Sequence, residues 1–334
     1  MTSSLIKPTF LITYSRPAQY NDYRCVVNST GTTAIFERGA SGTLNSQSIL
    51  YSLDLSGSGN VPAPFLTGTS APLYSGRPDW CWDNGNVAFN CVPEANGKTV
   101  IGYTTDGGAE TSLISSTTQM IYPTWFPPIE NQTQALGVMN CASGPPIPNT
   151  SVINLDGDLQ SSAVAGSTLW AGMPSVNQAA TNLIACAGQI IQDKGGYNQD
   201  LNYIWLVDTS TNSTAPLESG CPSWGSFTPQ FQGRSPWWSP DGNWIAFESN
   251  RAHQPTADNP SGLYAIFLYE VNGSNPAIQI TDPIYNANHA KWFPSGTELI
   301  VAAYQPGDDK SQPPAFPWGL ASLEVSSIVG SSTK

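Results

Sequence analysis

The feature that most constrains the fold of this chain is a strand–turn–strand unit that recurs along the sequence. Its clearest copy, SPWWSPDGNWIAF, spans residues 235–247, and related copies begin at residues 25, 79 and 290. Each copy places a glycine in a tight turn between two apolar runs, because glycine accepts the positive φ of hairpin turns. The repeat therefore predicts a series of β-hairpins.

The spacing of the turn glycines sets the number of units. Gly31, Gly85, Gly242 and Gly296 are separated by 54, 157 and 54 residues. Because the middle interval is about three times the length of one unit, two further units are expected inside it, around residues 122–138 and 172–185. A second turn follows in five of the units, at residues 56–57, 106–107, 156–157, 209–210 and 272–273. Each unit is therefore predicted to hold four strands.

Six four-stranded units predict an all-β chain folded as a six-bladed β-propeller, since four antiparallel strands per radial repeat form the blade of that fold. A single domain is expected over residues 1–334. Its blades are expected over roughly 20–68, 75–118, 120–167, 170–221, 232–282 and 286–328. Residues 5–15 are expected to close the last blade, with Thr9–Tyr14 pairing beside Gly319–Val325. Closure shared by both ends of the chain would remove exposed sheet edges.

The composition fits this fold and excludes several classes of function. Only 11% of the 334 residues are charged, against about 25% in an average soluble domain. With 24 Asp+Glu against 12 Lys+Arg the net charge is −12, so no basic patch is available to bind nucleic-acid phosphates. No apolar run reaches the roughly 18 residues of a membrane helix. We therefore expect neither a nucleic acid nor a membrane as a partner, and the sequence leaves the oligomeric state open.

The cysteines and sequons bear on the cellular compartment. None of the six cysteines pairs with another cysteine or a histidine at metal-ligand spacing, so no metal site is predicted. A disulfide between Cys186 and Cys221 is favoured, because both are expected at the upper edge of the fourth unit. Five N-glycosylation sequons, at Asn28, Asn131, Asn149, Asn212 and Asn272, are close to the number that chance would give. Low lysine content and the acidic balance favour a secreted or secretory-pathway glycoprotein, with a cytoplasmic location as the alternative.

The pattern Trp-Ser-Pro-Asp-Gly…Ile-Ala-Phe of the fifth unit, residues 238–247, resembles the repeats of TolB-like propellers. In such propellers the loops that enter each innermost strand share one face with the loops between the second and third strands, above an axial funnel. The resemblance places four long loops on that face, at 187–201, 222–234, 252–262 and 305–318. It also implies that Cys91, Cys141 and Cys186, at the ends of second strands, lie near the funnel. Trp82, Trp125, Trp238 and Trp292 share one position of the unit and are expected to wedge between blades.

Residues that enter the innermost strands are expected to ring the funnel. By alignment of the units, the predicted substrate-binding residues are Tyr23, Asp79, Trp80, Tyr122, Met173 and Trp237. The predicted catalytic residues are Arg24, Arg234, His289 and Lys291. Their mixture of aromatic and basic side chains suits a largely apolar guest that carries a polar handle. For each of them, simple packing between blades remains the alternative interpretation.

The absence of several catalytic motifs limits the classes of reaction that the chain is expected to catalyse. The sequence has no Gly-X-Ser-X-Gly elbow, no phosphate-cradling glycine motif and only two histidines, His253 and His289. We therefore expect an enzyme that needs no cofactor and acts on a small molecule by orientation and hydrogen-bond polarisation. In size, repeats, sequons and missing acid–base motifs, the chain is similar to secreted fungal β-propeller cyclases, the hetero-Diels–Alderases of tropolone–terpenoid pathways.

That second resemblance assigns roles to the predicted residues. It implies that Arg24, Arg234, His289 or Lys291 donates a hydrogen bond to a quinone-methide oxygen. It also implies that Trp80, Tyr122 and Trp237 stack on the substrate rings.

Two other classes of function stay open at this point. The first is a carbohydrate-binding lectin or polysaccharide lyase with one site. A lectin with one site per blade is disfavoured, because the rim positions 24, 80, 123, 174, 236 and 290 carry different residues. The second is a protein-interaction propeller, which predicts a plugged axis. A deep axial pocket would favour the enzyme, and shallow aromatic pockets recurring around the rim would favour the lectin.

Overall fold

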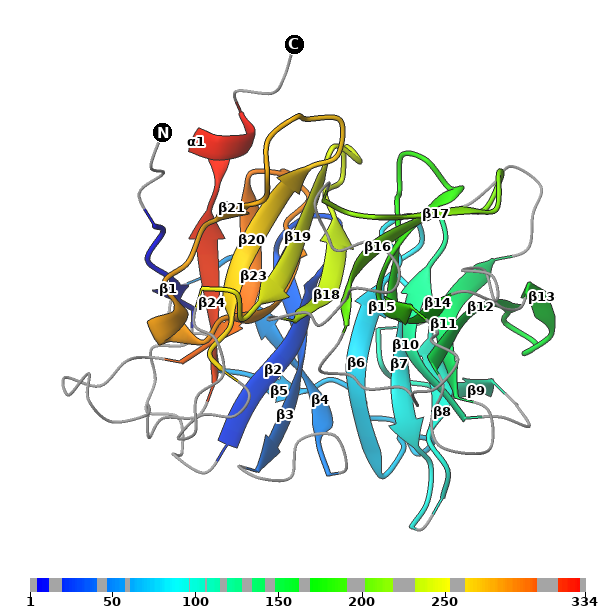
Figure 1. Ribbon diagram of the computed structural model, residues 1–334. Helices are drawn as coiled ribbons and strands as arrows, with labels where there is room; N and C mark the ends of the chain where they lie inside the picture. The colour runs from blue at the N-terminus through cyan, green and yellow to red at the C-terminus, as the bar shows by residue number, and fades with distance from the viewer. Residues whose placement is uncertain are drawn as a thin grey trace.

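The computed structural model is an all-β protein made of six four-stranded antiparallel sheets, arranged as the blades of a β-propeller (Figure 1). It describes residues 5–11, 20–40, 47–57, 61–95, 97–105, 107–114, 119–127, 134–141, 148–161, 169–190, 202–218, 232–252, 262–304 and 318–330. Helix within these ranges is confined to the one-turn α1 (Ser326–Val329) and the 3-10 turn Pro283–Tyr285. No helix of the described ranges has the length and apolar character needed to cross a membrane. The six-bladed fold predicted from the repeat is confirmed.

The strands follow one another from the axis outwards in each of the first five blades. Blade one holds β2 (Tyr20–Val27), β3 (Thr33–Ala40), β4 (Ile49–Asp54) and β5 (Ala63–Pro64), and blade two holds β6 (Tyr74–Trp80), β7 (Val87–Val92), β8 (Val100–Thr104) and β9 (Ser112–Ile114). Blade three holds β10 (Gln119–Trp125), β11 (Ala135–Cys141), β12 (Pro148–Asn154) and β13 (Leu159–Ser161). Blade four holds β14 (Leu169–Val176), β15 (Leu183–Ile190), β16 (Tyr203–Asp208) and β17 (Ser213–Pro216). Blade five holds β18 (Gly233–Trp238), β19 (Trp244–Ser249), β20 (Ala265–Glu270) and β21 (Ile278–Gln279).

The last blade is closed by both ends of the chain. It holds β22 (Asn288–Trp292), β23 (Glu298–Ala303), β24 (Gly319–Glu324) and, at its outer edge, β1 (Thr9–Phe10). Strand β1 runs antiparallel to β24, with Thr9 opposite Ser322 and Phe10 opposite Ala321. The predicted pairing of the two ends is therefore confirmed. It covers the outer edge of β24, which would otherwise expose unpaired backbone groups.

Every innermost strand contains a bulge near its middle. The ladder of β2, β6, β10, β14, β18 and β22 with its neighbour shifts register once in each blade. At each bulge one residue that is not glycine has a positive φ: Arg24 (42°), Arg77 (52°), Tyr122 (57°), Met173 (49°), Ser235 (49°) and His289 (51°). In four blades the next residue is proline, at positions 78, 123, 174 and 236. A bulge tolerates proline because the ladder is already interrupted there.

Tryptophans near the hairpin end of the innermost strands join neighbouring blades. The indole N–H groups of Trp82, Trp125 and Trp292 donate to backbone carbonyls of the preceding blade, at Val27 (2.8 Å), Asp79 (3.1 Å) and Trp237 (3.2 Å). The fourth member of the series, Trp238, is also buried, but its indole N–H has no partner among the described residues. These side chains are the wedges that the repeat predicted.

The cysteines depart from the sequence-based expectation. Cys25, Cys81, Cys91 and Cys186 are buried free thiols, and burial raises the pKa of each. Cys186 lies on β15 in an apolar cluster with Val176 and Trp205, away from the rim. The favoured disulfide with Cys221 is therefore wrong, because the Cys186 side chain points into the blade core. Cys221 itself, and the side chain of Cys141, lie outside the described residues.

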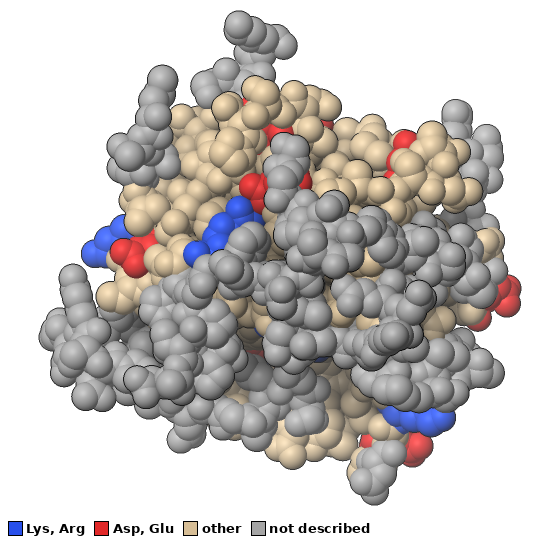
Figure 2. Space-filling model, viewed as in Figure 1, with Lys and Arg blue, Asp and Glu red and all other residues tan. Residues whose placement is uncertain are grey.

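The surface carries few charges where the structure describes it. Figure 2 shows a face on which most described residues are neither basic nor acidic. This agrees with the 11% of charged residues in the sequence. Of the described basic residues, Arg24, Arg77 and Lys291 lie inside the propeller.

Candidate functional site

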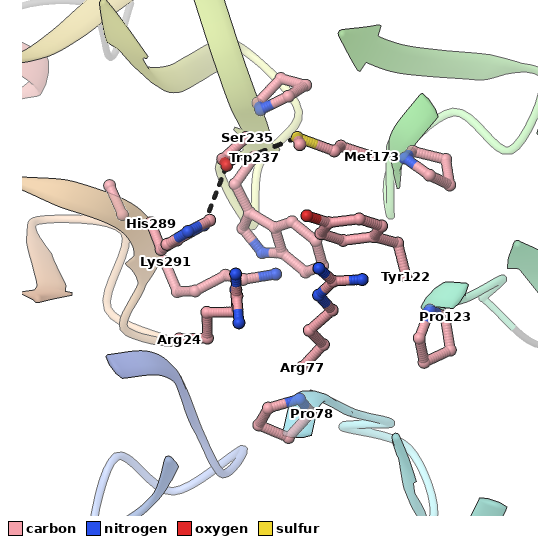
Figure 3. A pocket seen from close by; sticks show the side chains of 13 residues that line it. Arg24, Arg77, Pro78, Tyr122, Pro123, Met173, Ser235, Trp237, His289 and Lys291 are labelled. Atoms are coloured by element: carbon pink, nitrogen blue, oxygen red, sulfur yellow. Dashed lines mark hydrogen bonds between the residues drawn. The ribbon is translucent and has the colours of Figure 1, made fainter. Parts of the chain in front are cut away.

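The six bulges meet around a hollow on the propeller axis. The hollow has a volume of about 50 Å³. Its lining includes the left-handed residue of every blade, together with Trp237, Lys291 and the prolines that follow the bulges. Figure 3 shows Arg24, Arg77 and Lys291 directed towards its centre, beside the rings of Tyr122 and Trp237. One hollow therefore collects a different side chain from each of six blades.

Six of the ten residues predicted from the sequence line this hollow. They are Arg24, Tyr122, Met173, Trp237, His289 and Lys291. The structure also adds two left-handed residues that sequence reasoning missed, Arg77 and Ser235. A signal for both was present, because Arg77-Pro78 and Ser235-Pro236 repeat the X-Pro pair found at Tyr122 and Met173.

Two predicted residues lie behind the hollow. The Tyr23 ring packs edge-on against His289, with 4.6 Å between ring centroids. Arg234 pairs with the buried carboxylate of Glu248 (Nε–Oε1 2.8 Å), and its guanidinium lies 4.1 Å from the centroid of the Tyr264 ring. Neither side chain lines the axial hollow, so both support residues that do.

Asp79 and Trp80 lie towards the hairpin end, below the bulge. They line a second hollow of about 40 Å³, and the buried Asp79 carboxylate accepts the backbone N–H of Trp125 at 2.8 Å. The alignment had placed both at the entrance of the funnel, which Arg77 and the start of β6 occupy instead. Trp237 and Lys291 line both hollows and so form the partition between them.

A polar groove adjoins the axial hollow on the side of blades one to three. It has a volume of about 240 Å³ and shares Arg24 and Arg77 with the hollow. Its other polar lining residues include Glu37, Asn90 and Gln119. The groove gives an amphiphilic guest a polar extension beyond the aromatic walls.

Polar side chains on the second strands hold the bulges of the following blades. Glu37 Oε2 accepts the backbone N–H of Arg77 (3.2 Å), and Asn90 Oδ1 accepts that of Tyr122 (2.9 Å). In the same way Glu248 Oε2 accepts the backbone N–H of His289 (2.7 Å). Because a bulge removes ladder bonds, these acceptors satisfy N–H groups that the sheet leaves unpaired.

Arg24 and Arg77 share one buried acid. Arg24 Nη1 donates to Glu37 Oε2 at 3.0 Å, and Ser48 Oγ donates to Glu37 Oε1 at 2.8 Å. Burial alone would raise the pKa of Glu37, but the Arg24 guanidinium and the Ser48 hydroxyl outweigh it and lower the pKa. The guanidinium of Arg77 lies 3.9 Å from the centroid of the Tyr122 ring. Burial lowers the pKa of Arg77, which stays charged because its ordinary pKa is far above neutrality.

His289 is neutral at physiological pH. Burial lowers its pKa well below the usual range, and the positive charges of Arg24, Arg234 and Lys291 lower it further. Its Nδ1 lies 2.9 Å from Ser235 Oγ. When the Ser235 hydroxyl donates to Nδ1, the proton of the neutral ring is on Nε2, and the ring is a hydrogen-bond donor there.

Lys291 is the most unusual group of the site. Its ammonium lies over the indole ring of Trp237. Burial lowers the pKa of Lys291 to about 7, although the carboxylate of Asp79 opposes this shift. Burial likewise raises the pKa of Asp79, with Lys291 opposing. A large share of Lys291 is therefore an uncharged amine near neutral pH.

The side chains that line the hollow are mainly hydrogen-bond donors and aromatic rings, and few of them are typical metal ligands. Within the described ranges, no group of three or more His, Cys, Asp or Glu could hold a metal ion. Most of the four long loops expected above the hollow (187–201, 222–234, 252–262 and 305–318) lie outside the described residues. The description of the site is therefore limited to the residues of the innermost strands that line the hollow.

Comparisons with known proteins support the fold alone. No family model and no curated protein matches the sequence. Among solved structures, TolB from Acinetobacter baumannii superposes with a TM-score of 0.50 at 14% identity over 92% of this chain. The match spans 63% of the length of that TolB chain. Regucalcin from Agrobacterium tumefaciens, a calcium-binding protein, matches with a TM-score of 0.55 at 11% identity over 96% of this chain and 93% of its own.

A third solved structure shares the propeller but is much longer. A puromycin-hydrolysing peptidase from Mycobacterium tuberculosis matches with a TM-score of 0.51 at 11% identity, over 88% of this chain and 45% of its own. These structures show that the chain has the TolB-like six-bladed propeller fold. Because sequence identity is low and their functions differ, the function has to be argued from the site itself.

Proposed function

We propose that the chain is an enzyme with a single small-molecule site in the axial hollow, and that it catalyses a cyclisation of the hetero-Diels–Alder type. The observation that carries this proposal is the convergence of six different bulge residues, four of them Arg24, Arg77, Tyr122 and His289, on one hollow. Basic hydrogen-bond donors face aromatic rings across it. This pairing suits a planar conjugated substrate that carries one polar oxygen.

The reaction needs orientation and polarisation. In the cycloaddition an oxygen-containing heterodiene and an alkene form one C–O and one C–C bond, no atom leaves and no proton is transferred. A hydrogen bond from Arg24, Arg77 or Lys291 to the heterodiene oxygen withdraws electron density and stabilises the charge that develops there. The rings of Trp237 and Tyr122 hold the planar diene, and confinement of both partners lowers the entropic barrier.

Two features disfavour the other classes. The axis holds a small hollow with its own lining, which a plugged scaffold would not provide. The six bulge side chains are of five types, with arginine only in blades one and two, so they do not build one repeated sugar site per blade. The proposal therefore rests on one composite site.

A second candidate is favoured by the polar groove. Arg24, Arg77, Asn90 and Gln119 suit the carboxylate and hydroxyls of an acidic sugar. A neutral base such as His289 or Lys291 beside this groove could then abstract a proton next to the carboxylate in an elimination. This candidate uses the groove and not the aromatic walls, which separates it from the cycloaddition.

The test is a cycloaddition assay with a generic substrate pair. An o-hydroxybenzyl alcohol loses water to give an o-quinone methide, which is offered a cyclic alkene. We expect the protein to accelerate adduct formation and to favour one enantiomer, measured by chiral chromatography. Arg77→Leu should lower the rate about 10²-fold, as expected for loss of one oxyanion donor. Lys7→Met, at an exposed lysine, is the matched control and should leave the rate unchanged.

Three results would redirect the proposal. A racemic adduct formed at the uncatalysed rate, across a panel of substituted alkenes, would remove the cycloaddition. Cleavage of an oligouronide to an unsaturated product, abolished by Arg77→Leu, would establish the second candidate. Strong selective binding on a glycan array without turnover would favour a lectin.

A further inference from the structure

We propose that the amine of Lys291 captures planar conjugated aldehydes as a Schiff base, at the partition between the two axial hollows. The idea depends on the lysine and the hollows around it. It holds whether or not the protein catalyses a cycloaddition.

The position of Lys291 is the first support. It lies on β22 two residues after the bulge residue His289, and it lines both the axial hollow and the second hollow. Among the described residues no hydrogen bond or ion pair holds its Nζ, which lies over the ring of Trp237. A buried lysine is ordinarily paired with an acid. Here the amine is left open to whatever occupies the hollows.

The basic neighbours of Lys291 cannot do this chemistry. Guanidinium groups such as those of Arg24 and Arg77 remain protonated in proteins and do not attack carbonyls. The other two described lysines, Lys7 and Lys98, are exposed, and neither lines one of the two hollows or the groove. Lys291 is thus the one described primary amine that lies in a hollow.

The charges around Lys291 favour its neutral form. Asp79 on β6 and Cys25 on β2 act on it directly, and burial outweighs both to lower the pKa. Arg24 on β2 and Arg77 on β6 line the same hollow and, being positive, add no stabilisation to an ammonium. His289 on β22 is neutral and lends no charge. A lysine desolvated in this way is a nucleophile near neutral pH, as Schiff-base lysines are.

The step balances without a further reagent. The Nζ lone pair adds to the carbonyl carbon and gives a carbinolamine. A proton lost from nitrogen goes to the hydroxyl, which departs as water, and a C=N bond replaces C=O. Asp79 is the ionisable group facing the amine from β6, so its carboxylate stabilises the iminium when the imine is protonated.

The walls define the class of aldehyde. The ring of Trp237 lies directly at the amine, and Tyr122 lies across the axial hollow. Pro78 and Pro123 add flat apolar surface. An aryl or α,β-unsaturated aldehyde can stack on these rings while its carbonyl carbon meets Nζ, whereas a hydrated sugar aldehyde lacks such a planar face.

The experiment is reductive trapping in the full chain. The protein is incubated with cinnamaldehyde and cyanoborohydride, and the modified residue is mapped by peptide mass spectrometry. We expect one equivalent of label on Lys291, with labelling at least about tenfold faster than at Lys98. Since only the neutral amine reacts, the rate at Lys291 should rise with pH through about 7, while an ordinary lysine gains reactivity towards about 10.

Two variants at Lys291, a control at Lys7 and two contrary outcomes make the test decisive. Lys291→Met and Lys291→Arg should both lose the fast label, and Lys7→Met should keep it. Because the label is mapped in the unaltered protein, the result stands even if a variant misfolds. Label distributed over Lys7 and Lys98 at the rate seen at Lys291, or none at Lys291 across neutral pH, overturns the proposal. Since no quinone-methide precursor is present, the outcome is independent of the proposed cycloaddition.

Discussion

The two ends of the innermost strands follow the same repeat but use their side chains in opposite ways. At the hairpin end Trp82, Trp125 and Trp292 share both the residue type and the bond, an indole N–H donated to the preceding blade. At the bulge the backbone recurs while the side chains differ, with two arginines, a tyrosine, a methionine, a serine and a histidine. A repeated side chain thus marks packing, and a repeated backbone with divergent side chains marks the site.

The backbone conformation at the bulge is energetically unfavourable for residues other than glycine. A left-handed conformation at a non-glycine residue costs of order 1–3 kcal/mol, and glycine would avoid most of it. Yet none of the six positions is glycine. Each blade gives up some stability to present a side chain to the axis, which is typical of residues kept for binding or chemistry.

The largest expected effect lies at the hairpin end. Trp292 packs with Trp244 and Leu299 between blades five and six and is 1% exposed. Trp292→Ala should lower the free energy of unfolding by about 3–5 kcal/mol, because it leaves a large cavity between blades. Urea denaturation measures this change.

A second tryptophan provides the control for that measurement. Trp80 is half-buried and donates its indole N–H to Gly85 within its own hairpin. Trp80→Ala should cost only about 1–2 kcal/mol. Equal losses at the two positions would contradict the view that the wedges join the blades.

The next effect tests the support of the bulge. Glu248 holds the backbone N–H of His289 and pairs with Arg234. Glu248→Ala should lower stability by about 2–3 kcal/mol, since it leaves both groups without this acceptor. Glu248→Gln keeps an acceptor for the His289 N–H and should recover part of the loss.

The same pair of variants separates positioning from stability. If Glu248 acts by placing His289, turnover of the remaining folded Ala variant should fall in kcat more than in KM, and Gln should restore kcat. A Gln variant as inactive as the Ala variant, at restored stability, would show that the charge of Glu248 matters and not its hydrogen bond to the His289 backbone N–H.

The sequence predicted the fold more completely than the site, because the blades depend on local turns and the site depends on strand register. Turn glycines and apolar runs specify blades because hairpin chemistry is local, so four units and their spacing were enough to count six. The bulge depends on register, which the turn does not fix. The left-handed residue precedes the turn glycine by seven positions in units one, five and six, from Arg24 to Gly31 for example, but by eight in unit two, from Arg77 to Gly85.

The irregular spacing of unit two explains the error at Asp79 and Trp80. Aligning Trp82 with Trp238 matched Trp80 with Pro236 and Asp79 with Ser235, whereas the backbone matches Arg77 with Ser235, two residues earlier. The X-Pro pairs would have given the right register in four units. The hydrogen bonds that hold the bulges join residues far apart in sequence, such as the backbone N–H of His289 and the carboxylate of Glu248, and no local pattern encodes them.

The pH dependence of stability should reveal the buried amine. Lys291 has a pKa of about 7 when folded, against about 10.4 in an unfolded chain. Between these values the unfolded state binds more protons, so stability rises as pH increases from about 7 towards 10. Lys291→Met should remove this rise and stabilise the protein below pH 7, as measured by urea denaturation across that range.

The control for this measurement is Lys98→Met, at an exposed lysine. It should follow the unaltered protein at every pH, because its side chain is exposed and lies outside the hollows. A Lys291→Met profile parallel to that of the unaltered protein would show that the amine is protonated in the fold, and would also weaken the case for Schiff-base capture.

The smallest effect concerns the backbone conformation at the bulge. It is measurable because the stability difference between glycine and alanine should have opposite signs at positions 235 and 175. Ser235 is left-handed (φ 49°), whereas Ser175, in the corresponding strand of blade four, has no such conformation. Both are changed to alanine and to glycine, so that loss of the hydroxyl cancels within each pair. At 235 glycine should be more stable than alanine by about 1 kcal/mol, because strain is relieved. At 175 it should be less stable by about 0.5–1 kcal/mol, because glycine loses more freedom on folding. The same sign at both positions would mean that the bulges carry no strain, and that the divergent side chains on them need no functional explanation.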